Sequence, residues 1–256
     1  MAKAALAALE SALRARKLDR TLAPAGLCAV AGQLDRECTP TTIPQLDECL
    51  GGGLPRGQLC ELAGAPSSGR TTVLLRLLAG VTQRGDLAAL IDTTDSLDVA
   101  AAADAGIDLQ RLLWIRGSSP AHLARSDGDA FALERAIKAL NLVLQAGGFS
   151  IVAIDLADVP GALLKRLPLT TWLRLQRAIE GRETTCVLVV PEPLARSAGG
   201  LTIALTGEMT WNAPSRLRRL RGVQVTARVQ SPRRYANGET RFCTGELEPV
   251  VHRSAS

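Results

Sequence analysis

The sequence predicts an α/β fold with a mostly parallel central sheet flanked by helices, and three observations support this prediction. A glycine-rich loop at residues 64–69 lies between a short apolar strand and a helix. A second apolar strand, residues 150–155, ends in an acid, Asp155. Further apolar strands alternate with helical segments, which is the order of elements that builds a parallel sheet covered by helices.

The glycine-rich loop matches the pattern of a phosphate-binding loop except at one position. Such a loop needs glycines where the backbone curls, so that successive N–H groups face an anion, then a lysine and a Ser/Thr hydroxyl for Mg²⁺. Arg70 stands where the lysine is expected, and a planar guanidinium does not replace a compact ammonium. The candidate nucleotide-binding residues are Gly64, Ser67, Ser68, Gly69, Arg70, Thr71, Thr72 and Asp155.

The context of the loop favours this interpretation over an ordinary strand-to-helix turn. Residues 58–63 are predicted to form a strand, and residues 72–80 have apolar side chains at helical spacing. A helix that begins after the loop would direct the positive end of its dipole at the anion. Residues 150–155 are typical of a buried strand that delivers a carboxylate to a Mg²⁺ ion, although such strands are common outside nucleotide sites.

Length and composition restrict the classes of protein. With 256 residues, the chain can form one substantial core with small additions. No apolar run is long enough to span a membrane and no signal peptide is evident, so a cytoplasmic location is expected. The six cysteines are scattered and there are only two histidines, which indicates neither a metal site nor a disulfide framework.

The N-terminal segment is predicted to form a helix over residues 2–17, with Leu6, Leu9 and Leu13 along one stripe. This stripe either packs on the same domain or docks on another chain, and the sequence favours neither. Residues 1–41 are interpreted as an N-terminal helix and linker. Residues 42–256 are interpreted as the core, which ends in a basic β-rich segment.

The remaining elements follow from apolar periodicity and turn residues. Strands are expected at 87–91, 112–115 and 184–190, and helices at 100–105, 130–146 and 169–181. Nearer the C-terminus, residues 201–205 and 210–211 suggest two strands. Residues 222–229 alternate as an edge strand does, and Asn237-Gly238 predicts a hairpin turn.

The net charge of +5 is concentrated at the C-terminal end of the chain. Residues 201–256 contain nine Lys/Arg and four Asp/Glu, so the other residues balance. A solvated surface is one interpretation of this excess. The other is a patch that binds an acidic protein surface or DNA phosphates. Its candidate residues are Arg216, Arg218, Arg219, Arg221, Arg228, Arg233 and Arg234.

Two segments resemble the RecA family. Residues 42–57 include Leu46-Asp47 and the run Gly51-Gly52-Gly53-Leu54-Pro55-Arg56-Gly57, which lead into the glycine loop as in that family. Residues 91–98, Ile-Asp-Thr-Thr-Asp-Ser-Leu-Asp, are similar to the family segment that follows the next strand. The resemblance covers roughly residues 42–229 and implies a RecA-like P-loop core.

Three departures fall on positions that carry chemistry in the RecA family. The lysine is Arg70, the catalytic glutamate that orients water falls at Thr94, and the polar switch residue falls at Pro191. A hydroxyl cannot act as a base at neutral pH, and the adjacent Asp95 is expected to face the other side of its strand. Both loops that hold DNA in the family are also short in this sequence.

These departures lead to two main hypotheses. In the first, the chain resembles the ImuA family, RecA-like accessory proteins of damage-inducible mutagenesis and error-prone translesion synthesis. This implies RecA, an ImuB-type polymerase-like protein and an error-prone polymerase as partners, with possible self-association and single-stranded DNA contact, and no required cofactor, since ATP and Mg²⁺ would bind weakly. The alternative is a short RecA-type recombinase paralogue with DNA-dependent ATPase activity. A regulatory RecA-like protein ranks last.

Overall fold

The computed structural model describes residues 38–117, 126–194, 200–211, 220–230 and 238–244. All of them belong to one compact unit, residues 34–256. The predicted N-terminal helix and its leucines lie outside the described residues. Among the described helices, none combines the length and apolar composition that crossing a bilayer requires.

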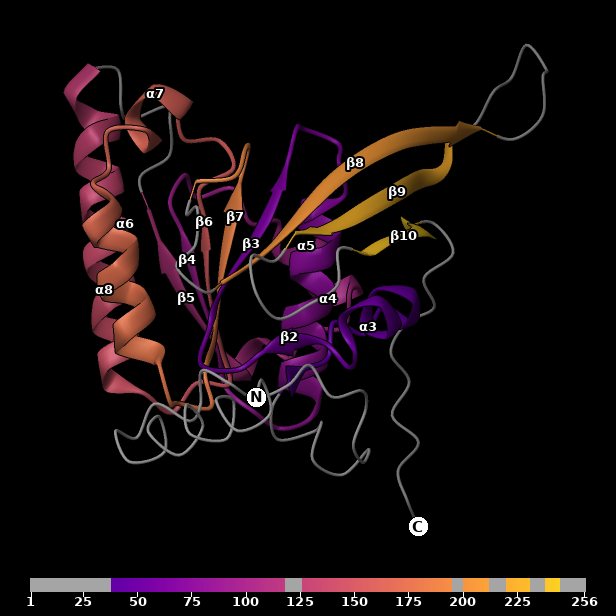
Figure 1. Ribbon diagram of the computed structural model, residues 1–256, viewed down its shortest axis with the longest axis horizontal. Coiled ribbons are helices and arrows are strands. Elements are labelled where there is room, and N and C mark those ends of the chain that lie inside the picture. Colours follow the sequence, from indigo (N-terminus) through magenta and orange to yellow (C-terminus); the bar gives the residue numbers. More distant parts are fainter. Residues whose placement is uncertain (1–37, 118–125, 195–199, 212–219, 231–237, 245–256) are drawn as a thin grey trace, which may run out of the picture. The chain divides into compact units, whose positions relative to one another are not determined.

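Up to residue 190 the described elements include both strands and helices, and beyond it they are strands (Figure 1). In chain order they are β1 (Cys38–Thr39), α3 (Pro44–Leu50), β2 (Leu54–Pro55), β3 (Leu59–Gly64), α4 (Arg70–Gln83), β4 (Ala88–Asp92), α5 (Val99–Asp104), η2 (Leu109–Arg111), β5 (Leu112–Arg116), α6 (Ser126–Ala146), β6 (Ile151–Asp155), α7 (Gly161–Leu164), α8 (Leu169–Ile179), β7 (Thr185–Val190), β8 (Leu201–Trp211), β9 (Leu220–Gln230) and β10 (Gly238–Cys243).

The described strands form an eight-stranded sheet in the order β10-β9-β8-β3-β7-β6-β4-β5, beside a two-stranded pair of β1 and β2. From β8 to β5 every pairing is parallel, whereas β9 and β10 run antiparallel to their neighbours. The inner parallel strands are buried on both faces, which explains why their sequences are largely apolar, with Glu61 of β3 as an exception. The predicted mostly parallel α/β fold is therefore confirmed.

Two apolar cores lie on opposite faces of this sheet. In Figure 1, α6 and α8 cover one face, and α3, α4 and α5 lie on the other. Alternate residues of β3 enter different cores: Cys60 and Leu62 pack toward α4, whereas Leu59 and Ala63 pack toward α8. The sheet therefore separates the helix that follows the glycine loop from the helices α6 and α8.

Three predictions about the C-terminal strands are wrong. Residues 201–211 form a single strand, because β8 pairs with β9 along its whole length. β9 is not an edge strand, because β10 pairs with its outer side. Gly238 is paired with Val229 and so lies in a strand, while Asn237 lies outside the described residues. In this register Phe242 is buried opposite Val225. The burial of apolar side chains thus sets the pairing of β9 and β10, and it outweighs the preference of Asn-Gly for a turn.

Candidate functional site

The glycine-rich loop connects β3 to α4, in the strand–loop–helix order that the sequence predicts. Gly69 is the N-cap of α4 with a φ of 90°, and a Cβ there would lie 2.5 Å from a methyl carbon of Val225. At Gly64 a Cβ would lie 2.7 Å from the carbonyl oxygen of Leu205. Both glycines are thus required by close packing of β8 and β9 as well as by the curl of the loop.

The Arg70 side chain is buried at the carboxyl edge of the sheet. The residue is 6% exposed, and its guanidinium donates from Nη1 to the carbonyl oxygens of Gly64 and, at 3.5 Å, Val190. Nη2 donates to the carbonyl oxygen of Ala157 at 3.4 Å and lies 4.0 Å from Asp158 Oδ1. The guanidinium therefore links the ends of β3 and β7 to the turn after β6.

The other loop residues differ in their hydrogen bonds and in their exposure to solvent. The Ser68 N–H donates to the carbonyl oxygen of Ala65 at 3.1 Å, and Ser68 Oγ is buried without a hydrogen-bond partner among the described residues. Ser67 adopts a φ of 63°, and Thr71 is exposed next to half-buried Thr72. One of the N–H groups that would face an anion is thus directed at the loop itself.

The β8–β9 hairpin packs directly against the glycine loop. A Cβ at Gly207 of β8 would lie 2.2 Å from the carbonyl oxygen of Ser67 and 2.8 Å from Val223 Cγ1. Together with Val225 beside Gly69, this places the loop in backbone contact with an antiparallel hairpin. Nothing in the local sequence of the loop indicated this contact.

Asp155 ends β6 opposite Asp92, which ends β4. Burial raises the pKa of Asp155 to about 6, and the carboxylates of Asp92 and Asp158 add to this increase. The N–H of Ala157, which donates to Asp155 Oδ1 at 2.9 Å, and the charge of Arg70 act in the opposite direction. Asp155 is therefore still mostly ionised at pH 7, but it takes up a proton as the pH falls through about 6, well above the usual range of an aspartate.

The Asp92 carboxylate is buried and accepts hydrogen bonds from neighbouring residues. The residue is 1% exposed and accepts hydrogen bonds from the N–H groups of Ser96 and Leu97 at 3.0 and 2.9 Å, and from Trp114 Nε1 at 3.2 Å. Among the described residues, no cluster of three or more His, Cys, Asp or Glu side chains could hold a metal ion. The two aspartates thus share a sheet edge but do not form a closed ligand set.

The segment after β4 contains the position expected for a catalytic acid. β4 ends at Asp92, so Asp95 lies in the following turn and the expected strand alternation does not apply to it. Asp95 has a φ of 56° and accepts a bidentate ion pair from Arg116 at 2.7 and 2.8 Å. The Arg116 guanidinium also lies over the Trp114 ring, 4.7 Å from its centroid. Asp95 is therefore held by Arg116, and Thr94 is half-buried beside it.

A family model described as the RecA N-terminal domain matches residues 9–162, which is more than half of the chain. The chain belongs to the RecA family.

Several curated relatives are named RecA. The protein from Ruminococcus albus is 32% identical over 162 residues, which cover 62% of this chain and 40% of the relative. The protein from a Picosynechococcus strain is 34% identical over 125 residues, which cover 49% of this chain and 32% of the relative. This RecA-family chain thus spans between about a third and two fifths of the length of these relatives.

The three RecA-family departures now have structural positions. Arg70 lies under the loop, Thr94 follows β4, and Pro191 directly follows β7. Neither a lysine ammonium nor a free carboxylate base lies at these positions. The residues present therefore do not fit a hydrolytic magnesium–nucleotide site, and no step of ATP hydrolysis follows from them.

A buried glutamate, which sequence analysis did not identify, fixes the chain on both sides of residues 195–199. Glu61 of β3 is 2% exposed and accepts from the Leu194 N–H at 2.9 Å and from Thr202 Oγ1 at 2.7 Å. In the RecA family the connection after β7 begins with a polar switch residue. In this chain Pro191 takes that position, and Glu61 anchors the connection from the neighbouring strand.

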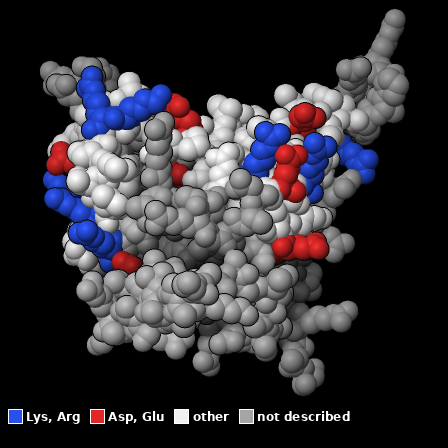
Figure 2. All heavy atoms as spheres, viewed as in Figure 1, with Lys and Arg blue, Asp and Glu red and all other residues white. Residues whose placement is uncertain are grey.

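Only part of the predicted basic patch lies among the described residues, namely Arg221 and Arg228. Arg228 donates to Glu239 at 2.7 Å, and Arg241 lies 3.6 Å from the same carboxylate. Figure 2 shows blue and red side chains interleaved on the right of the molecule, where β8, β9 and β10 lie. An acid thus neutralises part of the charge here. The other predicted members, Arg216, Arg218, Arg219, Arg233 and Arg234, lie outside the described residues.

Proposed function

We propose that this RecA-family chain is a non-recombinase accessory protein of DNA repair, similar to ImuA proteins, which acts in damage-inducible mutagenesis through protein contacts. The observation that carries this proposal is the Arg70 guanidinium. It is bonded to main-chain carbonyl oxygens at the end of β3, at the end of β7 and after β6. A cation that is hydrogen-bonded in this way serves the fold rather than a phosphate.

The magnitude of the losses supports a role without catalysis. Removing one group that stabilises charge in a transition state typically slows an enzyme by about 10²- to 10³-fold. Here the lysine is replaced by Arg70, and the water-orienting glutamate by Thr94. Asp95, the acid that follows Thr94 in the sequence, is paired with Arg116. Two such losses together leave almost no turnover to measure.

Phosphate release is the direct test. The purified protein is incubated with Mg²⁺ and ATP, with and without single-stranded DNA, beside the Asp155→Ala variant. The proposal expects the same background rate in all cases. DNA-stimulated release that Asp155→Ala abolishes would overturn it.

The alternative function, a short recombinase paralogue with DNA-dependent ATPase activity, has specific support. Gly64, Gly69, Thr71 and Asp155 keep the family pattern, and the relatives are named RecA. The same phosphate-release experiment separates the two functions, because only the alternative requires turnover that depends on DNA.

The partners in this proposal are RecA, an ImuB-type polymerase-like protein and an error-prone polymerase. The N-terminal leucines Leu6, Leu9 and Leu13 are the proposed docking stripe. Deleting residues 1–20 is expected to weaken association with RecA or with other copies of the chain, measured by analytical ultracentrifugation. Loss of the thermal unfolding transition in the truncated protein would instead assign the stripe to the chain's own core.

A further inference from the structure

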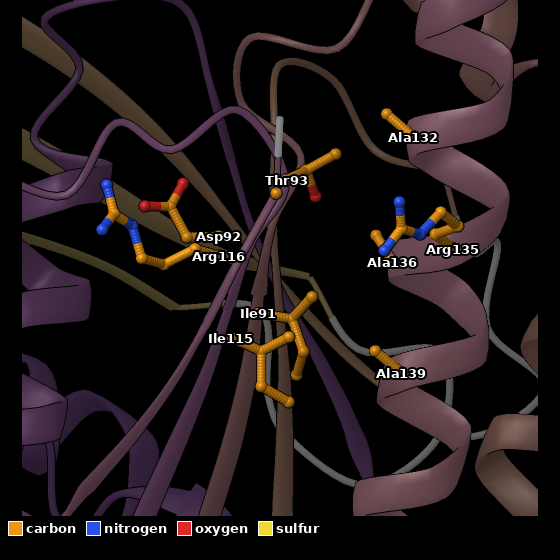
Figure 3. A pocket seen from close by; sticks show the side chains of 10 residues that line it. Ile91, Asp92, Thr93, Ile115, Arg116, Ala132, Arg135, Ala136 and Ala139 are labelled. Atoms are coloured by element: carbon orange, nitrogen blue, oxygen red, sulfur yellow. The ribbon is translucent and has the colours of Figure 1, made fainter. Parts of the chain in front are cut away.

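A cavity of about 160 Å³ lies between the carboxyl ends of β4 and β5 and the helix α6. Its walls are mainly apolar side chains of the two strands and of one face of the helix (Figure 3). The residues that matter for its chemistry are Ile91, Thr93, Ile115, Arg135, Ala136 and Ala139. α6 lies on the face of the sheet opposite to α4, so this cavity is separate from the glycine loop.

The cavity contains a hydroxyl that lacks a partner. Thr93 is 2% exposed, and its Oγ1 has no hydrogen-bond partner among the described residues. In Figure 3 the Thr93 side chain projects toward α6, where Arg135 extends toward the strands. A buried hydroxyl is normally hydrogen-bonded, so an unpartnered one beside a cavity indicates a ligand that supplies the missing acceptor.

The charges around the cavity leave Arg135 as its available cation. Glu134 is paired with Lys138 at 2.8 Å, and Asp95 is paired with Arg116. Asp92 and Arg116 also line the cavity. In Figure 3 the Asp92 side chain points away from α6, and its carboxylate accepts hydrogen bonds from the N–H groups of Ser96 and Leu97. The Arg135 guanidinium lies over the Phe131 ring, 5.7 Å from its centroid, and makes no ion pair with an acid among the described residues. The polar end of the cavity thus offers a guanidinium and a hydroxyl.

We propose that this cavity binds a carboxylate on a short aliphatic stem. The carboxylate accepts from Arg135 and from Thr93 Oγ1, and the stem packs on Ile91, Ile115 and Ala139. The volume is well below the range of about 300–1,000 Å³ typical of drug-sized ligand sites, which excludes a nucleotide. The group can belong to a free small acid or to a glutamate side chain of another polypeptide.

Titration followed by methyl NMR tests this site. The probes are butyrate and its neutral counterpart butyramide, and the reporters are the methyl groups of Ile91 and Ile115. Butyrate is expected to shift these signals with millimolar affinity, and butyramide to bind at least about 5-fold more weakly, since it loses the charge-assisted hydrogen bond. Equal affinity for the two probes, or no shift with butyrate, would overturn the proposal.

Matched variants separate this site from general charge effects. Thr93→Val and Arg135→Gln are each expected to weaken butyrate about 5-fold or more, because each removes one donor to the ligand. Thr93→Ser keeps the hydroxyl and should retain binding even where Thr93→Val perturbs the fold. Arg174→Gln is the control, since it removes a positive charge from an exposed position of α8 outside the cavity lining. An Arg174→Gln effect as large as that of Arg135→Gln would contradict a specific site.

A blocked glutamate, N-acetylglutamate N-methylamide, distinguishes the two sources of the carboxylate. If it binds as well as butyrate, the cavity admits a side chain that carries a backbone, and a partner polypeptide is the source. If only butyrate binds, the ligand is a free small acid. Either outcome supports a site for a carboxylate on an aliphatic stem. If neither compound binds, the proposal is overturned.

Discussion

Arg70 Nη1 donates a hydrogen bond to the carbonyl oxygen of Gly64, so the residue that follows the glycine loop is bonded to the residue that begins it. The loop is thereby closed at its base. The same guanidinium reaches Val190 and Ala157, which are 120 and 87 residues away in the chain. The residue that replaces the family lysine has become a link between strands.

Arg70→Lys is expected to lower the free energy of unfolding by about 1–3 kcal/mol, because an ammonium cannot reach three carbonyl groups in a fixed planar arrangement. Urea denaturation measures the loss. Arg174→Lys, at an exposed position of α8, is the control and should change stability little. Equal stability of the Arg70→Lys variant and the natural protein would show that the guanidinium contacts contribute nothing.

Asp155→Asn is expected to stabilise the protein at pH 8 but not at pH 4. The folded pKa of Asp155, about 6, lies above the ordinary value of 3.8. The contribution of Asp155 to stability is therefore fully present below pH 3.8 and is lost as the pH rises through 6. Asparagine avoids this loss, which is worth about 1–3 kcal/mol. Thermal unfolding between pH 4 and 8 measures it, with Asp104→Asn as an exposed control. A pH-independent difference between Asp155→Asn and the natural protein would contradict the raised pKa.

Gly207→Ala is expected to destabilise the protein by about 3 kcal/mol, because the added methyl would overlap the Ser67 carbonyl oxygen and force the hairpin away from the loop. Gly85→Ala is the comparison. Gly85 has a φ of 88° and open space around it, so an alanine there meets only backbone strain of about 1 kcal/mol. Chemical denaturation of both variants gives the difference. Similar values for the two would show that β8 does not press on the loop.

A variant in which Glu replaces Arg216, Arg218, Arg219 and Arg221 is expected to bind the mutagenesis partners more weakly. A smaller loss of binding is expected for DNA. The reason is that these arginines hold much of the net positive charge, while Arg228 and Arg241 share Glu239. Binding at low salt is measured by fluorescence anisotropy for DNA and by pull-down for the proteins.

The control for this prediction reverses four charges elsewhere, at Lys165, Arg166, Arg174 and Arg177 of the α7–α8 region. Equal losses in the two variants would show an effect of net charge alone. If neither DNA nor partner binding changes in the first variant, the patch is only a solvated surface.

The sequence by itself determined the order of the main strands and helices from β3 to β7 and the position of the loop, but not the strands beyond residue 200. Apolar runs at residues 59–64, 151–155 and 185–190 specify buried parallel strands, and the spacing of Gly64 and Gly69 specifies the turn into α4. It also determined the loss of the lysine at Arg70 and of the acid at Thr94, because these depend on residue identity alone.

Only the tertiary structure decided what the Arg70 guanidinium does, because its partners Val190 and Ala157 become neighbours through strand order. The same holds for Gly207 against Ser67, and for Thr93 facing Arg135 across a cavity. Local sequence patterns indicate which segments form buried strands or helices and where the chain turns. Contacts between residues far apart in the chain depend on which strands are adjacent and in which register, and no local periodicity encodes that.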